Sequence, residues 1–252
     1  MLKQGFIQSA TVEVKYDRGI VYLNKCGILA QSVLDKLGAT FRLMNVPTVE
    51  QAELHSDVER VTVRFGREGF SVSQLAPHTA ALIQRNVPEA WTCVRDGLEI
   101  DRFVTRCGFR IIFLWPTDDC RAALTELMRA GITSLSPGWT EVFGRPSNTT
   151  VTALYGDEMT GMRRVSVDLI EYRLEGLFPA GQEEIFPRSA IKLDIDCIYP
   201  TEKRKHYSLG PGQLSEFMRS SWESAKKTRA DFTALLASKE LLEPSIPSES
   251  KS

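Results

Sequence analysis

The sequence predicts a pseudo-duplicated α+β protein, in which two successive β-α-β-β-β-α units form antiparallel sheets with helices packed on one face. Three observations predict this class. Several segments alternate apolar and polar residues, which is the pattern of strands with one buried face. Segments with the period of amphipathic helices separate these strands. The order of strands and helices then repeats in the second half of the chain, without residue-level similarity between the halves.

The first half is predicted to span residues 1–100. Residues 10–16 alternate and predict a strand, and a short apolar stretch follows at 20–23. Apolar residues at every fourth position predict a helix over about 29–37, which Gly38 ends. Residues 40–44 predict another strand, and 60–73 a hairpin with a glycine-containing turn at 66–69. Two helical stretches follow, at about 78–85 and, with Pro88 in a first-turn position, at 89–98.

The second half is predicted to span residues 101–240. Alternating apolar residues from Phe103 to Phe113 predict a long strand, and residues 117–119 can cap a helix that Gly131 ends. A loop rich in Gly, Pro and Ser at 134–148 precedes strands at about 149–155, 163–174 and 190–199. A long helix at about 213–238 closes this half, and residues 241–252 predict a disordered tail. Whether the two halves share one sheet is left open.

Composition excludes several classes of protein. The chain has 252 residues, with 31 basic and 32 acidic side chains, and this near-neutral balance excludes a generally basic nucleic-acid coat. It contains no apolar run long enough for a membrane helix and no pattern of a secretory signal, so we expect no membrane and a cytoplasmic location. Five cysteines, an odd number without C-x2-C spacing, disfavour a disulfide framework or a zinc knuckle.

Basic residues recur on strands that the pattern predicts. Arg102, Arg106 and Arg110 are expected on one face of the strand that opens the second half. With these we group the basic residues of the hairpin and of the segment before the last helix, namely Arg60, Arg64, Arg67, Lys203, Arg204 and Lys205. Together they predict a groove for a nucleic acid or an acidic protein surface. The alternative is that they are solvated strand faces and edge-protecting charges.

Acidic residues gather on another predicted strand. Asp194 and Asp196 point the same way on the strand at 190–199, and Asp168 can approach from the neighbouring strand. Such a cluster predicts a Mg²⁺ site for phosphoryl chemistry. The alternative is a solvated strand face with Lys192 as a charge partner, and no histidine or glycine-rich phosphate loop supports the metal.

The common catalytic and nucleotide-binding motifs are absent. The sequence has no G-x-S-x-G, Walker A, G-x-G-x-x-G or H-E-x-x-H pattern, and none of His55, His78 and His206 has another histidine or a cysteine two to four residues after it. We therefore expect no cofactor and single out no catalytic residue.

A few motifs resemble a sporadically distributed family of bacterial proteins of about 250 residues, for which no function is established. They are the strand Arg106-Cys107-Gly108-Phe109-Arg110, the segment from Leu193 to Tyr199, and the closing helix with Phe232 six residues after Lys226. The resemblance covers most of residues 10–238. It implies a bacterial accessory protein of the kind carried in mobile or defence-associated gene sets.

The sequence leaves three hypotheses about function. The first is a non-enzymatic, cytoplasmic binding protein that acts through a protein partner, as an immunity, antitoxin or defence-complex subunit. The second is a nucleic-acid-binding protein that uses the arginine-lined sheet faces. The third is a metal-dependent phosphoryl-transfer enzyme that uses the three aspartates. The partner and the oligomeric state are left open.

Overall fold

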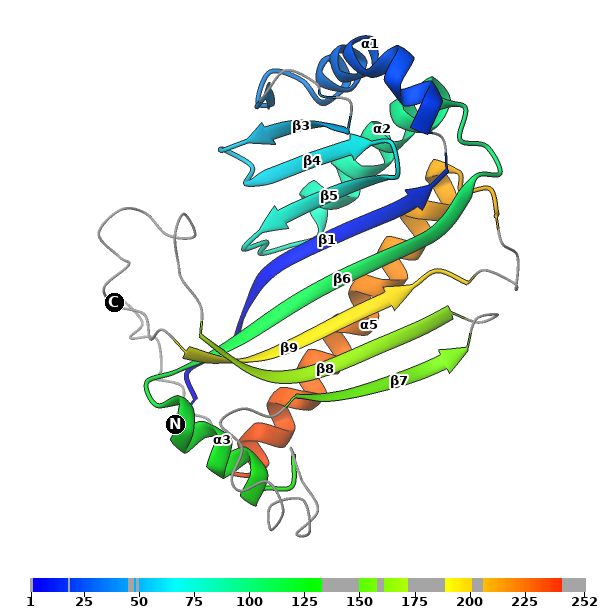
Figure 1. The fold of residues 1–252 in the computed structure, drawn as a ribbon. Coiled ribbons are helices and arrows are strands. Elements are labelled where there is room, and N and C mark those ends of the chain that lie inside the picture. The colour runs from blue at the N-terminus through cyan, green and yellow to red at the C-terminus, as the bar shows by residue number, and fades with distance from the viewer. Residues whose placement is uncertain are drawn as a thin grey trace, which may run out of the picture.

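The computed structural model of the chain describes residues 2–17, 19–44, 48, 50–132, 150–157, 161–171, 189–200 and 206–241. These residues form one antiparallel sheet of nine strands with four helices packed on it (Figure 1). From edge to edge the strands are β2 (Arg42–Leu43), β3 (Gln51–Ser56), β4 (Val61–Gly66), β5 (Gly69–Leu75), β1 (Phe6–Tyr16), β6 (Val104–Thr117), β9 (Ser189–Ile198), β8 (Gly161–Glu171) and β7 (Val151–Asp157).

The sheet runs without interruption through both predicted halves. The first strands of the two halves, β1 and β6, pair with each other along nearly their whole length, from Phe6 opposite Leu114 to Tyr16 opposite Val104. Strand β5 flanks this central pair on one side and β9 on the other. The α+β class with a large antiparallel sheet is therefore confirmed, and the two halves share that sheet.

Alternating residues give the sheet one apolar side and one polar side. In β1, Val12 and Val14 are fully buried, whereas Thr11 and Glu13 are partly exposed. The same alternation holds in β4 and β5, whose buried residues include Phe65. Burying the apolar residues of all strands on one side requires a layer of helices there.

Four helices supply that layer among the described residues: α1 (Gly19–Leu37), α2 (Ala81–Leu98), α3 (Cys120–Arg129) and α5 (Pro211–Ser238). In Figure 1, α2 and α5 pass behind the strands, with α5 crossing several of them diagonally, whereas α1 lies at the top of the view and α3 at the lower left. Trp91 of α2 packs on Phe70 with ring centroids 5.4 Å apart, and Phe232 of α5 packs on Trp115 at 5.1 Å. Aromatic contacts thus join helices and sheet in both halves.

Most predicted elements are confirmed, and the differences have local causes. The stretches at 78–85 and 89–98 are one helix, α2, which continues through Pro88 because the adjacent Val87 and Trp91 are fully buried against the sheet. Residues 20–23 belong to α1, which begins at Gly19 and ends, as expected, before Gly38 at a positive φ of 88°. Strand β3 was not predicted, since its buried positions include the small residues Ala52 and Ser56.

Three predictions lie partly or wholly outside the described residues: the loop at 134–148, the strand beyond residue 171 and the tail from 242. Leu241, the first residue of the predicted tail, is buried, and its carbonyl accepts a hydrogen bond from the Leu2 amide at 2.9 Å. Within the described residues, no helix has both the length and the apolar character needed to cross a membrane.

Candidate functional site

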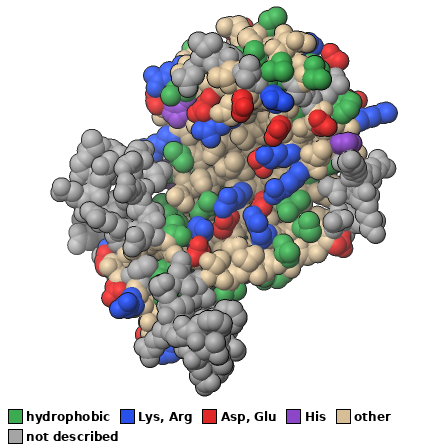
Figure 2. Space-filling view, viewed as in Figure 1, with side chains coloured by type: hydrophobic (Ala, Val, Ile, Leu, Met, Phe, Trp, Pro, Cys, Tyr) green, Lys and Arg blue, Asp and Glu red, His purple; other side chains and the backbone are tan. Residues whose placement is uncertain are grey.

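The candidate site is the sheet face opposite the helices, called here the open face. Figure 2 shows this face, where basic and acidic side chains gather across the central strands. The open face is defined by the outward-pointing residues of seven strands: Glu53, His55, Thr62, Arg64, Ser71, Ser73, Thr11, Glu13, Lys15, Arg106, Arg110, Asp194, Asp196, Arg164 and Ser166. A sheet face with so many charges and hydroxyls contacts water or a polar partner instead of a core.

Three arginines and two aspartates form the centre of the open face, called here the arginine cluster. Strand pairing places Arg110, Asp196 and Arg164 side by side on β6, β9 and β8. The Asp196 Oδ2 atom accepts hydrogen bonds from Arg164 at 3.0 Å and from Arg106 at 3.2 Å. Arg110 donates from Nε to Asp194 Oδ1 at 2.8 Å and from Nη2 to the second carboxylate oxygen. The two β6 arginines and Arg164 are thus tied to β9.

The cluster is layered, with carboxylates below and guanidinium groups above. The side chains of Asp194 and Asp196 are 9% and 7% exposed, whereas those of Arg106, Arg110 and Arg164 are 45%, 47% and 47% exposed. The outermost polar atoms are therefore N–H donors that are held in place by buried acceptors. This layer can donate hydrogen bonds to an acceptor brought to the open face.

Gly108 permits the contact between Arg106 and Asp196. Asp196 lies opposite Arg110 on β6, so the Arg106 side chain must pass over the intervening position 108 to reach it. A Cβ atom on Gly108 would come 3.3 Å from Asp196 Oδ1 and 3.9 Å from Arg106 Nη2. A larger side chain at this position would therefore separate the two charged groups.

Burial and charge act in opposite directions on the carboxylates. Burial raises the pKa of Asp196 above its ordinary value, and this effect exceeds the lowering by Arg106, Arg164 and Arg110. The hydrogen bonds from Arg110 to Asp194 raise the pKa of the Arg110 guanidinium. Arg110 therefore stays charged throughout the accessible pH range.

The basic residues predicted from the sequence fall into three groups. Arg64 joins Arg106 and Arg110 on the open face, and its Nε donates to Glu53 at 2.8 Å. The hairpin turn holds Arg67, and turns before β4 and β6 hold Arg60 and Arg102, at positive φ of 53° and 69°. The expectation that Arg102 shares a strand face with Arg106 was wrong, because β6 begins at Val104, after that turn. Lys203, Arg204 and Lys205 lie outside the described residues.

Sequence reasoning missed Arg164, Glu13 and Lys15 as members of the site. Glu13 and Lys15 form an ion pair at 3.1 Å, and Glu13 also lies 4.0 Å from Arg106. The alternation of Glu13 and Lys15 with Val12 and Val14 predicted a polar strand face. It did not identify the neighbouring strand whose side chains lie beside that face. That neighbour depends on the pairing of β1 with β6, which joins residues about a hundred positions apart in the chain.

The three predicted metal ligands each face a basic side chain. Asp194 and Asp196 contact the arginines described above, and Asp168 lies 3.5 Å from Lys192 and accepts a hydrogen bond from Thr150 at 3.0 Å. In the described parts of the chain, no group of three or more His, Cys, Asp and Glu side chains is placed to hold a metal ion. These contacts favour the alternative of an ion-paired strand face, and metal binding by the three residues stays a prediction.

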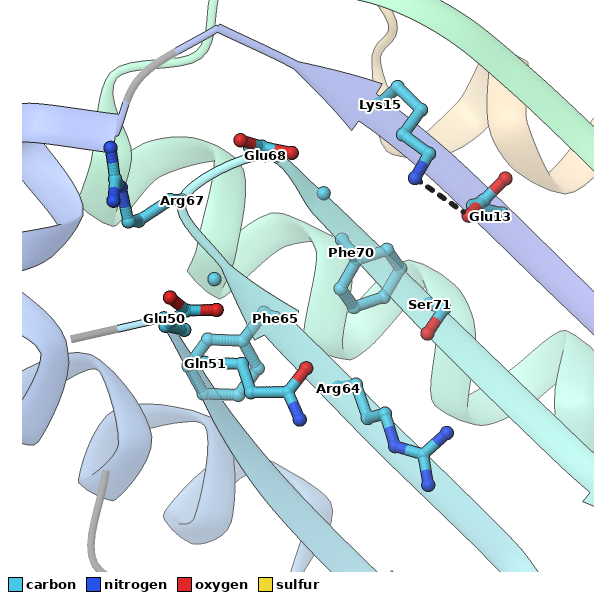
Figure 3. A pocket seen from close by; sticks show the side chains of 12 residues that line it. Glu13, Lys15, Glu50, Gln51, Arg64, Phe65, Arg67, Glu68, Phe70 and Ser71 are labelled. Carbon is cyan, nitrogen blue, oxygen red and sulfur yellow. Dashed lines mark ion pairs between the residues drawn. The ribbon is translucent and has the colours of Figure 1, made fainter. Parts of the chain in front are cut away.

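A pocket of about 290 Å³ opens at the β4–β5 hairpin end of the open face (Figure 3). The side chains that line it include the paired Glu13 and Lys15 of β1, Arg64 of β4 and Ser71 of β5. Glu50, Arg67 and Glu68 add further charges of both signs at the turns. The pocket therefore extends the mixed-charge surface toward the first-half edge of the sheet.

No protein-family model matches the chain, and no curated protein is similar to it in sequence.

Proposed function

We propose that the chain is a non-enzymatic binding protein whose open face docks a protein partner. The observation that supports this best is the layered arginine cluster at the centre of a broad sheet face that the described helices leave uncovered. Fixed donors above buried acceptors form a rigid, patterned surface, and such charge patterns select partners by complementarity. The sequence resemblance adds the proposal of a cytoplasmic immunity, antitoxin or defence-complex subunit.

The balance of charges favours a protein over a nucleic acid. Each open-face arginine has a carboxylate partner: Arg64 pairs with Glu53, Arg110 with Asp194, and Arg106 and Arg164 with Asp196. Hydroxyl pairs lie between these charges, including Thr11 with Ser73 at 2.8 Å. A phosphate backbone binds best to uncompensated cations, whereas a protein surface of mixed charge can match a mixed pattern.

The test is affinity capture from native cells, using the wild type and two sets of variants. Arg106→Gln with Arg164→Gln alters the open face, and Arg129→Gln on α3, whose partner is Glu126, is the matched control. We expect a protein that is recovered with the wild type and the control to be lost with the double variant, and its purified form to bind the chain directly. Recovery of the same proteins with all three baits would contradict the proposal. The genes adjacent to that of the partner would test the defence-related class.

Nucleic-acid binding is the second candidate, and the exposure of the guanidinium groups favours it. The three cluster arginines are nearly half exposed above their carboxylates, so their outer N–H groups can reach phosphate oxygens. This function predicts mobility shifts of DNA or RNA that weaken steeply as salt rises and that weaken further in the double variant. Unchanged mobility of both nucleic acids at low salt would reject it.

Metal-dependent phosphoryl transfer by Asp168, Asp194 and Asp196 is the third hypothesis carried from the sequence. It predicts uptake of Mg²⁺ or Mn²⁺ that is lost on Asp194→Asn, and titration calorimetry without uptake would end it.

We also propose that the two halves are structural repeats. Within the described residues, each half begins with a central strand, continues with a helix and three further strands, and ends with a helix, and the two-residue β2 is the one element there without a counterpart. The strand order is symmetric about the β1–β6 pair apart from that edge strand. Superposition of the halves in an experimental structure would test this proposal.

A further inference from the structure

A groove on the helix side of the sheet lies away from the open face. It has a volume of about 790 Å³ and lies between the β7–β8 hairpin, the end of β9 and the first half of α5. We call it the underside groove and define it by Arg163, Tyr199, Phe217, Ser220 and Ser224. Its volume is within the range of pockets that bind small molecules, and its walls combine apolar rings with a few polar groups, as such pockets do.

Among the described residues, the helices on the second half of the sheet differ in length from those on the first half. The 19-residue α1 covers strands of the first half, whereas α3 has 10 residues. Helix α5 presents the small residues Ser220 and Ser224 to the space where larger side chains would fill it. Tyr155 of the edge strand β7 is consequently 51% exposed.

Arg163 is the unusual residue of the groove. The next residues of β8 on the same side are Val165 and Val167, which pack against the core, so an arginine here replaces an expected apolar residue. Its Nη1 atom donates to Ser224 Oγ at 2.8 Å and to Thr228 Oγ1 at 3.1 Å, and its guanidinium carbon lies 5.4 Å from the centre of the Tyr155 ring. The helix hydroxyls and the ring thus fix the guanidinium at the groove wall.

No carboxylate of the described residues forms an ion pair with Arg163, in contrast to its neighbour Arg164, which pairs with Asp196. The two hydrogen bonds to α5 come from one nitrogen, so the other guanidinium nitrogens can donate to an acceptor in the groove. A half-buried guanidinium without a carboxylate favours an anionic ligand group. Tyr199 and Phe217, in edge-to-face contact with centroids 5.3 Å apart, offer an apolar wall to the rest of the ligand.

We propose that the underside groove binds a small amphipathic anion, with a carboxylate, phosphate or sulfonate group at Arg163 and an aromatic or aliphatic body along Tyr199 and Phe217. This site is independent of the open face, because adjacent β8 residues point to opposite sides of the sheet. Binding there does not require the protein partner.

Two fluorescent probes with nearly the same aromatic body test the proposal. 8-Anilinonaphthalene-1-sulfonate carries an anion, and N-phenyl-1-naphthylamine does not. We expect the folded wild type to bind the sulfonate at least about tenfold more tightly than the neutral amine, as a charge-assisted hydrogen bond implies. Arg163→Gln should abolish this preference and Arg163→Lys should retain part of it. Arg129→Gln on α3, a matched control outside both the groove and the open face, should leave the preference unchanged.

A second variant covers the case in which Arg163→Gln does not fold, as judged by circular dichroism. Ser220→Trp places a large side chain in the groove from an exposed helix position and should weaken the binding of both probes at least about tenfold. Equal affinities of the wild type for the two probes would overturn the proposal. So would an unchanged sulfonate preference in folded Arg163→Gln, or full binding in Ser220→Trp.

Discussion

At the scale of single residues, Asp196 is a buried carboxylate on which burial and neighbouring charges have opposite effects. Burial raises the pKa of its carboxyl despite three nearby guanidinium groups, so the folded protein gains little from ionising it. Arg106 and Arg164, its hydrogen-bond partners, are nearly half exposed and can be hydrated if the carboxylate is removed. The main consequence of Asp196 is then the orientation of two arginines.

Asp196→Asn is accordingly expected to change the free energy of unfolding by less than about 1 kcal/mol near neutral pH, since the lost ion pairs and the removed cost of burial nearly cancel. Urea unfolding followed by circular dichroism measures this change. A loss of about 3 kcal/mol or more, typical of a buried pair that stabilises its fold, would contradict this account.

The same residue gives a pH dependence of defined sign. Because the folded-state pKa of Asp196 is raised, the folded protein binds more protons at this site than the unfolded chain does between the ordinary and the raised value. The contribution of Asp196 to stability therefore increases as the pH falls through that interval and decreases as it rises. The stability of the wild type relative to Asp196→Asn should shift in favour of the wild type between about pH 7 and about pH 4. A shift toward the variant in paired urea titrations would show that the sign is wrong.

At the scale of elements, α2 keeps a proline within a continuous helix. Pro88 has no amide hydrogen and cannot complete the helical bond to the carbonyl of Gln84, yet the flanking Val87 and Trp91 are buried. Pro88→Ala should therefore raise the free energy of unfolding by about 1 kcal/mol or more, as measured by urea unfolding. The control is Pro211→Ala at the start of α5, where proline suits the first helical position and no gain is expected. Equal effects of the two substitutions would contradict this interpretation.

At the scale of the whole molecule, one sheet joins the two halves, so they are expected to unfold together. Trp91 reports on the first half, and Trp222, stacked on Phe109 with centroids 6.3 Å apart, reports on the second. In a variant that keeps only Trp91 and in one that keeps only Trp222, with the other tryptophans replaced by Phe, the fluorescence transition should coincide with the far-ultraviolet transition of the same variant. Separate transitions for the two halves would show that the β1–β6 pairing does not couple them.

The sequence predicted elements better than the contacts between them. The alternation in β1, β4 and β9 identified which residues face the core, because those strands have large apolar side chains on one side. Strand β3 gave a weaker signal because Ala52 and Ser56 are small. The arginine cluster could not be assembled, since the contact of Arg164 with Asp196 depends on the pairing of β8 with β9. Pairing between strands is not encoded in the periodicity of either strand alone.

The central position of β1 also affects how the protein is made. Among the strands of this sheet β1 is synthesised before the others, yet its neighbours β5 and β6 follow only after several tens of further residues. Until then, both edges of β1 lack their native partners, and its apolar residues have no helix layer to cover them. The apolar residues of β1 therefore stay uncovered during synthesis, and the edge of β1 that pairs with β6 lacks its partner for longer than the edge that pairs with β5.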